Sequence, residues 1–588
     1  MPQENHDTDV LIIGSGFGGS VAALRFAEAG KSVVILERGP HITRDTNQVD
    51  LDALWIPGKH RYGPNDLQSR GKNIVPWLGA GVGGGSHVYA GTMKRAASFE
   101  GFPEAIVSDD MGPYYQIAEN MMDTQYYPDY SPYSDVRATQ LFYNTGEILK
   151  EKYPDIVEDW GPIHLAISFA PDGGTPGEEF INKHGAKQRY SDPKEQSLLG
   201  GDIDAKNTLD KNYLHLAEKE GASIRPLSQA EKIEPLPNGG YRVHYKEFVQ
   251  ETGWAKFRRN WLRGKARDTM TSVTCETLVL AAGSIGSTEL LLNSRDRDKS
   301  LPNLSKRLGE SYSTNGDFIS LLFPFRGLSV SWLGLALAIA GLVLWKWWLL
   351  APGAAAYYLG LAFSRRAFDP DIGTTNSDFI RFKARDGSTQ GAYIESGRYP
   401  TPIRLVLAIV LSSLGLWRPR HYGKIVTFTK ILRLFVPPFA LLARSWPIPM
   451  LKMGKDDALG TFRLEKGRVV IDFDLSKNTE FYQYLDDLGK IVAKSSRSIW
   501  APNIMFKLTK RLEVPHNQGG VPMGEDTNSG VVDHAGRVFG YENLLVLDGA
   551  IFPISPGPNP ALTILAICER AMVHILKPET SVESTDDN

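Results

Sequence analysis

Cysteine is nearly absent from this chain of 588 residues, which contains only Cys275 and Cys568. The two are far apart in the sequence and lack the close spacing of metal ligands. This scarcity argues against a disulfide framework and against a zinc site, so no metal is expected. It also fits a protein of a reducing compartment.

A surplus of either charge is also absent. The sequence has 65 lysine and arginine residues against 67 aspartate and glutamate residues, for a formal net charge of -2. Because no basic face is indicated, we expect no nucleic-acid partner. The length allows two or more domains, or one large interwoven body.

The N-terminus lacks the apolar core of a signal peptide. Residues 1–7 are polar and acidic and lead directly into the first predicted strand. We therefore expect the body of the protein to be cytoplasmic. The short acidic tail at 578–588 is expected to be disordered.

Charge is missing from long stretches in the middle of the chain. Residues 327–345 and 347–364 are uncharged, and 405–417 is uncharged and mostly apolar. Each half of the first stretch approaches the length of a membrane span, about 20 apolar residues. Flanking tryptophan, arginine and lysine are typical of surfaces that lie on anionic lipid. We expect 327–364 and 405–443 to contact the cytoplasmic side of a membrane, as a peripheral, monotopic or anchored surface; a buried hairpin is the alternative.

The clearest motif lies in the first forty residues. A short apolar strand, 9–13, leads into Gly14-Ser15-Gly16-Phe17-Gly18-Gly19, and a helix and a second strand follow before Glu37. Gly14 allows a tight turn, Gly16 lets the backbone approach a pyrophosphate, and Gly19 lets helix and strand pack closely. Glu37 can accept hydrogen bonds from an adenosine ribose. The order of these parts predicts a dinucleotide site; the alternative is a glycine-rich turn without a ligand.

A second glycine-rich stretch follows at 79–86. It contains Gly79, Gly81, Gly83, Gly84 and Gly85 and ends in Ser86. Such a stretch is either a flexible turn or backbone that lies against a flat ligand, and after a dinucleotide motif we favour the ligand. His87 comes next and raises the question of covalent flavin attachment, although an ordinary hydrogen-bonded histidine is the simpler interpretation.

Two later segments return to the same parallel sheet in this interpretation. Residues 277–282 form an apolar strand that ends in Ala282 and Gly283, and 543–547 form another that ends in Asp548 and Gly549. A long helix then begins at Pro560, with proline at its first position and Asn559 as its cap.

Together these segments resemble the glucose–methanol–choline oxidoreductases, and within that family the branch of bacterial cholesterol oxidases. The likeness rests on 10–19, 80–86, 205–209 and 304–309 and on the end of the chain, and it covers roughly 1–320 and 460–577. One departure is the cysteine cluster that related sequences often have before 205–208, which this chain lacks.

The resemblance implies an α/β fold, α+β overall, with FAD as the cofactor. A Rossmann-like FAD-binding domain would be interwoven with a substrate domain built on an antiparallel sheet. The first would comprise 1–100, 190–315 and 510–577; the second would comprise 101–189 and 316–509, with the apolar insertion 327–364 and the apolar segments 405–443.

The resemblance also implies the cofactor contacts. These are Gly14, Gly16, Phe17, Gly18, Gly19, Glu37, Gly81, Gly83, Gly84, Gly85, Ser86, Ala282, Gly283, Asp548, Gly549, Asn559 and Pro560. The positive N-terminus of the last helix would face the flavin and favour its anionic reduced form.

The expected chemistry is alcohol oxidation. His516 matches the active-site histidine of the family and is suited to take the hydroxyl proton as the carbinol hydride goes to flavin N5; a structural histidine is the alternative. Asn559 matches the residue that orients the substrate oxygen. Glu395 resembles the glutamate with which cholesterol oxidases move the steroid double bond. In an apolar pocket its pKa would be raised, so it could carry the proton that this step moves. An exposed strand glutamate is an equal alternative at this position.

Three functions remain open at this point. An FAD-dependent oxidoreductase of a lipophilic alcohol, a sterol or steroid, is favoured, and a long-chain aliphatic alcohol is the first alternative. A membrane lyase or isomerase like the fatty-acid photodecarboxylases is the second. His516 with Asn559 favours alcohol oxidation, since a decarboxylase needs no alcohol base. Oxygen, a quinone and a carrier protein all stay open as electron acceptors.

Overall fold

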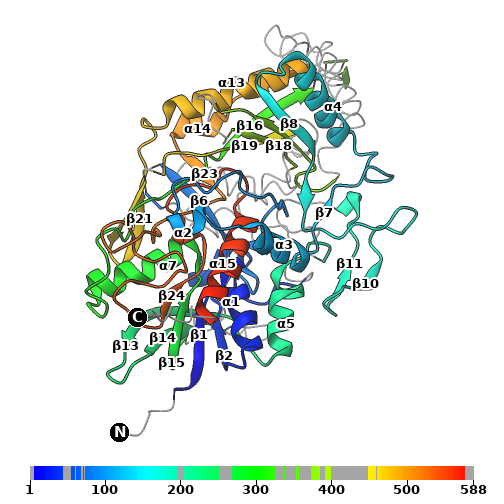
Figure 1. The fold of residues 1–588 in the computed structure, drawn as a ribbon. Helices are drawn as coiled ribbons and strands as arrows, with labels where there is room; N and C mark the ends of the chain where they lie inside the picture. Colours follow the sequence, from blue (N-terminus) through cyan, green and yellow to red (C-terminus); the bar gives the residue numbers. More distant parts are fainter. Residues whose placement is uncertain are drawn as a thin grey trace, which may run out of the picture.

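Two sheets dominate the computed structural model (Figure 1). The first lies in the lower half of the view, and the second lies in the upper half under helices α4 and α13. The structure describes residues 6–43, 54–59, 61–67, 70–71, 73–195, 204–249, 268–324, 373–384, 391–398, 448–458 and 460–576, with a few isolated residues between 325 and 372.

The first sheet is centred on β1 (Thr8–Ile13), an apolar strand buried along nearly its whole length. It pairs in parallel with β2 (Val33–Leu36) and with the second half of β15 (Thr269–Leu280). The outer parallel strands are β12 (Ser223–Arg225), next to β2, and β24 (Leu544–Val546), next to β15. Parallel strands that are buried on both faces must be covered by helices, which explains why they read as continuous apolar runs.

Three helices of this half are joined through one carboxylate. They are α1 (Phe17–Glu28), α5 (Tyr213–Lys219) and α15 (Ala561–Leu576). Glu569 on α15 accepts a hydrogen bond from Arg25 on α1 at 2.7 Å and one from Tyr213 on α5 at 2.7 Å. Because Glu569 is only 3% exposed, these bonds satisfy a charge that would otherwise be costly to bury.

Strand β15 is long enough to belong to two ladders. Its first half pairs antiparallel with β14 (Tyr241–Glu247), which pairs with β13 (Ser228–Pro235). Its second half ends beside β1 and β24 and leads into helix α7 (Gly283–Leu292). The turn between β15 and α7 therefore lies next to the glycine turn after β1.

The second sheet is antiparallel throughout. One face of it packs on helices α4 (Arg137–Lys152) and α13 (Thr479–Ser495) through residues such as Ile380 and Ile394. Side chains alternate along a strand, so Phe379, Tyr393 and Glu395 lie on the opposite face. In order, its strands are β22 (Ser498–Ala501), β16 (Phe318–Pro324), β19 (Ile448–Met453), β18 (Tyr393–Ser396), β17 (Asp378–Phe382) and β8 (Val157–Pro162).

Short elements connect the two halves. β6 (Ile74–Gly79) pairs with β5 (Asn65–Leu67) and, in parallel, with β23 (Leu512–Val514), which brings the segment before His516 beside the second glycine stretch. The remaining strand pairs are β3 (Trp55–Ile56) with β4 (Arg61–Tyr62), β7 (Gln125–Tyr126) with β9 (His164–Leu165), β10 (Glu179–Ile181) with β11 (Lys187–Arg189), and β20 (Thr461–Glu465) with β21 (Arg468–Asp472). The remaining helices are α2 (Glu104–Val107), α3 (Gly112–Met121) and α14 (Ile504–Thr509).

The mixed α/β class expected from the sequence is confirmed. The strands of the first sheet lie between 8 and 280 and at 544–546, and those of the second lie between 157 and 501. The exact division of the chain into FAD-binding and substrate segments stays a prediction.

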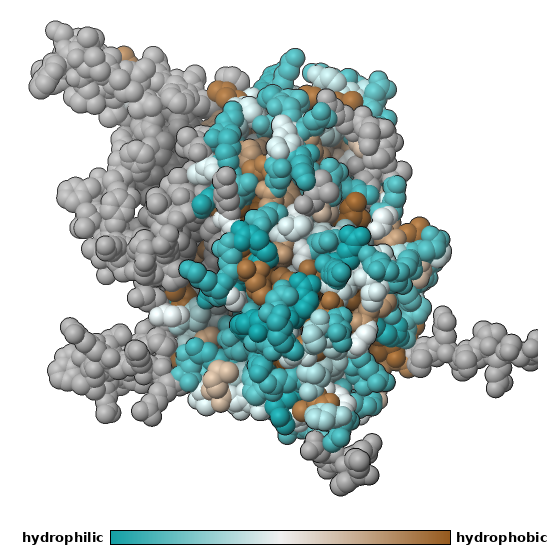
Figure 2. Space-filling model, turned by 90° about the vertical axis from the view of Figure 1, so that its left-hand side faces the viewer, coloured by the Kyte–Doolittle hydropathy of each residue, from teal (hydrophilic) through white to brown (hydrophobic). Residues whose placement is uncertain are grey.

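The apolar segments 327–364 and 405–443 lie outside the described residues, apart from Leu337, 352–353 and 355–356. Among the helices that the structure describes, none has the length and apolar character needed to cross a membrane. On the face in Figure 2, hydrophilic and hydrophobic residues are interspersed over the described surface. The membrane-contacting helices expected from the sequence are thus not supported here and stay a prediction.

Candidate active site

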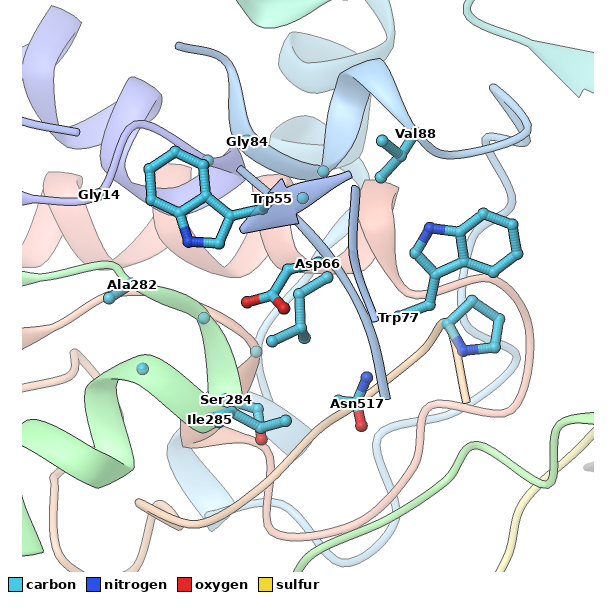
Figure 3. A pocket seen from close by; sticks show the side chains of 18 of the residues that line it. Gly14, Trp55, Asp66, Trp77, Gly84, Val88, Ala282, Ser284, Ile285 and Asn517 are labelled. Atoms are coloured by element: carbon cyan, nitrogen blue, oxygen red, sulfur yellow. The ribbon is translucent and has the colours of Figure 1, made fainter. Parts of the chain in front are cut away.

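A cavity of about 1310 Å³ reaches from the ends of β1 and β2 to the second sheet. Figure 3 shows Gly14, Gly84 and Ala282 bordering the same space as Trp55 and Asp66. Ligand pockets usually measure about 300–1,000 Å³. The cavity is therefore large enough for a dinucleotide and a second molecule.

The turn after β1 requires glycine at its first position. Gly14 has a φ of 99°, and a Cβ atom on it would lie 2.3 Å from the carbonyl oxygen of Ala281. A Cβ atom on Gly16, in contrast, would meet nothing within 4 Å. Because Gly16 lines the cavity at the start of α1, its open side is where a phosphate can approach the positive end of the helix.

The second glycine stretch packs directly on the first. A Cβ atom on Gly84 would lie 2.7 Å from the Cα atom of Gly16. The hydroxyl of Ser15 accepts a hydrogen bond from the amide of Gly83 at 3.1 Å and donates one to Glu37 at 2.7 Å. Ser15 was not among the expected site residues, although a hydroxyl between two motif glycines is a signal that could have identified it.

The carboxylate of Glu37 is buried at the end of β2. Oε2 accepts hydrogen bonds from the amide and hydroxyl of Ser15, and Oε1 accepts one from the amide of Gly39 at 2.8 Å. A carboxylate oxygen can accept two hydrogen bonds. Glu37 thus organises the turn and keeps acceptor capacity at the cavity, which it lines.

Three further residues line the same end of the cavity. Arg38 pairs with Asp66 at 2.9 Å, and its guanidinium lies over the ring of Trp55 at 5.6 Å from the centroid. Within the described residues, Oδ1 of Asp66 has no hydrogen-bond partner although it is buried. A free acceptor beside a flat indole suits a planar ring that carries amino hydrogens, such as adenine.

Asp548 joins the end of β24 to the start of α7. It accepts hydrogen bonds from the amide of Gly283 at 2.8 Å and from the amide of Ala550 at 2.7 Å. Burial raises the pKa of Asp548 to about 6, although these bonds and one from Ser287 oppose the shift. Asp548 lines the cavity together with Ala282 and Gly549.

His516 follows β23 and is held by Asp317, which directly precedes β16. Nδ1–H of His516 donates to Oδ1 of Asp317 at 2.7 Å, and its backbone N–H donates to Oδ2 at 3.0 Å. With the proton on Nδ1, Nε2 is left as a hydrogen-bond acceptor. Burial alone would lower the pKa of His516, but the charge and hydrogen bond of Asp317, and then the charge of Glu395, raise it above its usual value.

Asp317 was not among the residues expected from the sequence. It is 0% exposed and lies 199 residues before His516 in the chain. The available signal was weak: a single acidic residue immediately before the apolar run of β16.

Glu395 is 0% exposed on β18, so the alternative of an exposed strand glutamate is wrong. Its Oε2 accepts hydrogen bonds from the side-chain amides of Asn559, at 3.4 Å, and of Asn376. Both asparagines line the cavity, whereas Glu395 itself lies one layer behind the wall. Burial raises the pKa of Glu395 to about 7 against the opposing charge of Lys94.

The last helix begins later than expected, and Asn559 does not cap it. α15 starts at Ala561, and Oδ1 of Asn559 has no hydrogen-bond partner among the described residues. The reason is that the amide is engaged with the buried carboxylate of Glu395 instead. The start of the helix still faces the cavity through Asn559, Pro560 and Ala561.

Most of the expected cofactor contacts line the cavity, and four do not. Gly19, Gly81, Gly83 and Ser86 lie behind the wall, where they support the turns. Those that line it are Gly14, Gly16, Phe17, Gly18, Glu37, Gly84, Gly85, Ala282, Gly283, Asp548, Gly549, Asn559 and Pro560.

His87 is a buried, hydrogen-bonded histidine. Its Nε2 lies 2.6 Å from the carbonyl oxygen of Val82, and the residue is 2% exposed. It is not among the residues that line the cavity. The structure thus favours the simpler interpretation of His87 over covalent attachment of a cofactor.

Comparison with known proteins agrees with this site. An FAD binding domain matches residues 9–82, and a GMC oxidoreductase domain matches residues 490–568. The turn, the cavity and these matches define a flavoprotein oxidoreductase with FAD as its cofactor. More particularly, the resemblance to the glucose–methanol–choline oxidoreductases seen in the sequence is confirmed.

Full-length relatives support this assignment. The chain is 29% identical over 611 residues to a cholesterol oxidase of Mycobacterium tuberculosis, covering 96% of this chain and 90% of that protein. It is 27% identical over 618 residues to a cholesterol oxidase of Acinetobacter baumannii, covering 99% and 97%. A pyridoxine 4-oxidase from Mesorbium loti has the same fold, with a TM-score of 0.52 and 16% identity over 96% of this chain and 98% of that chain.

Proposed function

We propose that this flavoprotein oxidises the hydroxyl group of a lipophilic alcohol of the sterol class. The observation that carries the proposal is the pair of His516 and Asp317. His516 lies on the cavity wall, its Nδ1 is held by Asp317, and its Nε2 has no hydrogen-bond partner among the described residues. Asn559 lines the same cavity. A proton acceptor on His516 and the side-chain amide of Asn559 in one cavity are groups that allow an alcohol to lose its proton in a fixed orientation.

His516, Asp317 and Asn559 would have different roles in this reaction. Nε2 of His516 takes the hydroxyl proton, and the carboxylate of Asp317 stabilises the imidazolium that results. The amide of Asn559 holds the substrate oxygen but cannot take its proton. When bound, FAD supplies the acceptor for the hydride of the alcohol carbon.

The cavity fits FAD through features of this chain. The open side of Gly16 accommodates the pyrophosphate, Glu37 offers an acceptor to the ribose, and Asp66 with Trp55 suits adenine. The N-terminus of α15 would supply positive potential to the flavin.

The second sheet gives the cavity an apolar wall. Alternate residues of β16 line it, namely Ile319, Leu321 and Phe323, and β19 contributes Pro449 and Leu451. Covering such side chains with a lipophilic molecule contributes about 25 cal/mol per Å² of apolar area removed from water. A rigid, flat sterol matches an extended sheet face, and cholesterol oxidases are among the relatives.

Glu395 is proposed to move the double bond of a suitable sterol after oxidation. A carboxyl group with a pKa near neutrality can both take and return a proton. Glutamine has no O–H, and its side-chain oxygen can still accept hydrogen bonds from Asn376 and Asn559, so we expect Glu395→Gln to leave alcohol oxidation largely intact. Only the migration of the double bond should stop, which chromatography of the products would show.

The two alternatives make different demands on the site. A long-chain aliphatic alcohol would use the same His516 and Asn559 on the same apolar wall. A lyase or isomerase acting on a fatty acid would not need a proton acceptor at His516. The three can therefore be separated by which compound reduces the flavin.

The test is anaerobic reduction of the bound flavin by a panel of sterols and fatty alcohols, with fatty acids assayed under light and in the dark. Fast bleaching by sterols supports the proposal. Bleaching by fatty alcohols alone would replace the substrate class, and light-driven loss of fatty acid without bleaching by any alcohol would overturn the proposal. Adding air or a soluble quinone to the reduced enzyme then identifies the electron acceptor.

We also propose that 327–364 and 405–443 form a membrane-contacting surface near the entrance for the substrate. Support comes from their uncharged, apolar sequence and their flanking tryptophan and basic residues. A sterol is held in lipid, so contact with a bilayer would shorten its path to the cavity.

A further inference from the structure

Lys94 places its ammonium group in a half-buried position, without an anionic hydrogen-bond partner among the described residues. Its Nζ atom lies 2.7 Å from the ring centroid of Phe379 and 5.1 Å from that of Tyr393. In the part of the chain that the structure describes, Lys94 forms no hydrogen bond or ion pair. An unpaired buried charge is costly, so its position calls for an explanation.

The two rings locate this ammonium group beside Glu395. Phe379 on β17 is directly opposite Glu395 in the sheet, and Tyr393 lies two residues before Glu395 on β18. Residues opposite one another, and residues two apart, share one face of a sheet. Lys94 therefore lies on the same face as the Glu395 carboxylate.

The hydrogen bonds of Glu395 are those of an ionised group. The side-chain amides of Asn376 and Asn559 both donate to Oε2, and Oε1 has no partner among the described residues. A protonated carboxyl would need an acceptor for its own hydrogen, whereas the two asparagines, as they are oriented here, offer Glu395 only donors. The ionised form, however, requires a compensating positive charge.

Among the positive charges near Glu395, that of Lys94 contributes most to stabilising the ionised carboxylate. For Glu395, burial raises the pKa; the charge of Lys94 is the strongest opposing influence, followed by His516 and the Asn559 amide, while Asp317 adds to the rise. For Lys94, burial lowers the pKa to about 7, and Glu395 opposes this most. Asp159 and Glu158 on β8 also raise the pKa of Lys94, and Arg381 on β17 lowers it.

We propose that Lys94 is a positioning residue that favours the ionised form of Glu395 and thereby the orientation of the Asn559 amide in which Nδ2 faces Glu395. The inference rests on the proposed alcohol oxidation for its functional meaning. If Glu395 were neutral, its O–H would donate to Oδ1 of Asn559, and the amide would turn over. Asn559 would then present a different atom to the substrate oxygen.

The experiment compares Lys94→Met with Lys94→Arg in the full-length enzyme carrying FAD. Methionine keeps the length of the apolar stem without the charge, and arginine keeps the charge. The ionisation of Glu395 is followed by infrared difference spectroscopy, with Glu395→Gln identifying its carboxyl band. This measurement needs no substrate, so it decides the role of Lys94 even if no alcohol reduces the flavin.

An opposite charge a few ångströms away shifts a carboxyl pKa by about one to three units. We expect Lys94→Met to raise the pKa of Glu395 by that amount and Lys94→Arg to return it toward the wild-type value. The pH profile of flavin reduction should shift with the pKa of Glu395. As the pH is lowered, the rate in Lys94→Met should begin to fall at a higher pH than in the wild type. Identical titration of Glu395 in wild type and Lys94→Met, or equal behaviour of the two variants, would overturn the inference.

A reciprocal measurement covers the case in which Lys94→Met fails to fold. Glu395→Gln removes the negative charge that raises the pKa of Lys94, so this pKa should fall further. NMR of isotopically labelled lysine follows the titration directly. An unchanged Lys94 titration in Glu395→Gln would show that the two groups are not coupled.

Discussion

Replacing Asp317 by asparagine tests the core of the proposed mechanism with almost no change in volume. In the native protein both carboxylate oxygens accept hydrogen bonds from His516, at 2.7 Å from Nδ1 and 3.0 Å from the backbone nitrogen. Asparagine has only one oxygen. If that oxygen keeps the backbone bond, an NH₂ group faces Nδ1 and forces the ring proton onto Nε2, where the alcohol proton must go.

The expected loss follows from what His516 is asked to do. A positioned acid–base group contributes on the order of 10²–10⁴-fold to a rate, which corresponds to about 3–5 kcal/mol of barrier. The charge of Asp317 also raises the pKa of His516. Because the base acts when neutral, the rate should rise with pH through this pKa, and Asp317→Asn should move that rise to lower pH.

The assay is stopped-flow reduction of the flavin by the best alcohol of the panel, without oxygen, over a range of pH. Flavin absorbance confirms that the cofactor is still bound. Asp456→Asn is the matched control: Asp456 is 1% exposed and accepts hydrogen bonds from the amide and hydroxyl of Thr314, at 2.8 and 2.7 Å, instead of from His516. The control should lose stability without moving the pH profile. Turnover within a few-fold of wild type in Asp317→Asn, with an unmoved profile, would refute the reasoning.

Four further predictions can be tested, three from the structure of the site and one from the apolar sequence of 327–364. Gly16→Val should fold, since its Cβ meets nothing within 4 Å, yet lose FAD because the side chain fills the phosphate space; circular dichroism and flavin absorbance report the two effects separately. His516→Ala should keep its flavin but reduce it on the order of 10²–10⁴-fold more slowly, and a wild-type rate would show that the proton leaves elsewhere. Asn559→Ala should slow reduction without lowering the flavin potential, because Asn559 does not cap α15; a lowered potential would restore the capping role. The wild-type protein should co-sediment with anionic liposomes, and replacing leucines of 327–364 by serine should weaken this; a protein that never binds liposomes contradicts the membrane surface.

The cofactor end of the site was largely predictable because its requirements are local. Gly14 must adopt a positive φ, Gly16 must leave one side open, and Glu37 must end the next strand. These conditions act on neighbouring residues of one short segment, so the sequence shows them in order. Apolar runs likewise predicted β1, β24 and the end of β15, because strands that are buried on both faces leave little room for polar residues.

Neighbouring residues in the sequence were a poorer guide where a side chain had a choice of partners. Asn559 before a helix has the residue type of a cap, yet its amide lies against Glu395. Glu395 was equally consistent with an exposed and a buried position. Its burial follows from the place of β18 between β17 and β19 in the middle of the second sheet.

By itself, the sequence determined the FAD cofactor and the resemblance to the glucose–methanol–choline oxidoreductases, because both depend on residue types at short, regular spacing. That resemblance also named His516 and Asn559 as candidate site residues, and these roles stay predictions. Only the tertiary structure showed Asp317 under His516 and Lys94 beside Glu395. Asp317 and His516 are 199 residues apart, and Lys94 is placed near Glu395 through the ring of Phe379, which is paired with Glu395 in the sheet. The physical reason is that a charge is paired by whatever the fold brings within a few ångströms, and neither spacing nor composition records that distance.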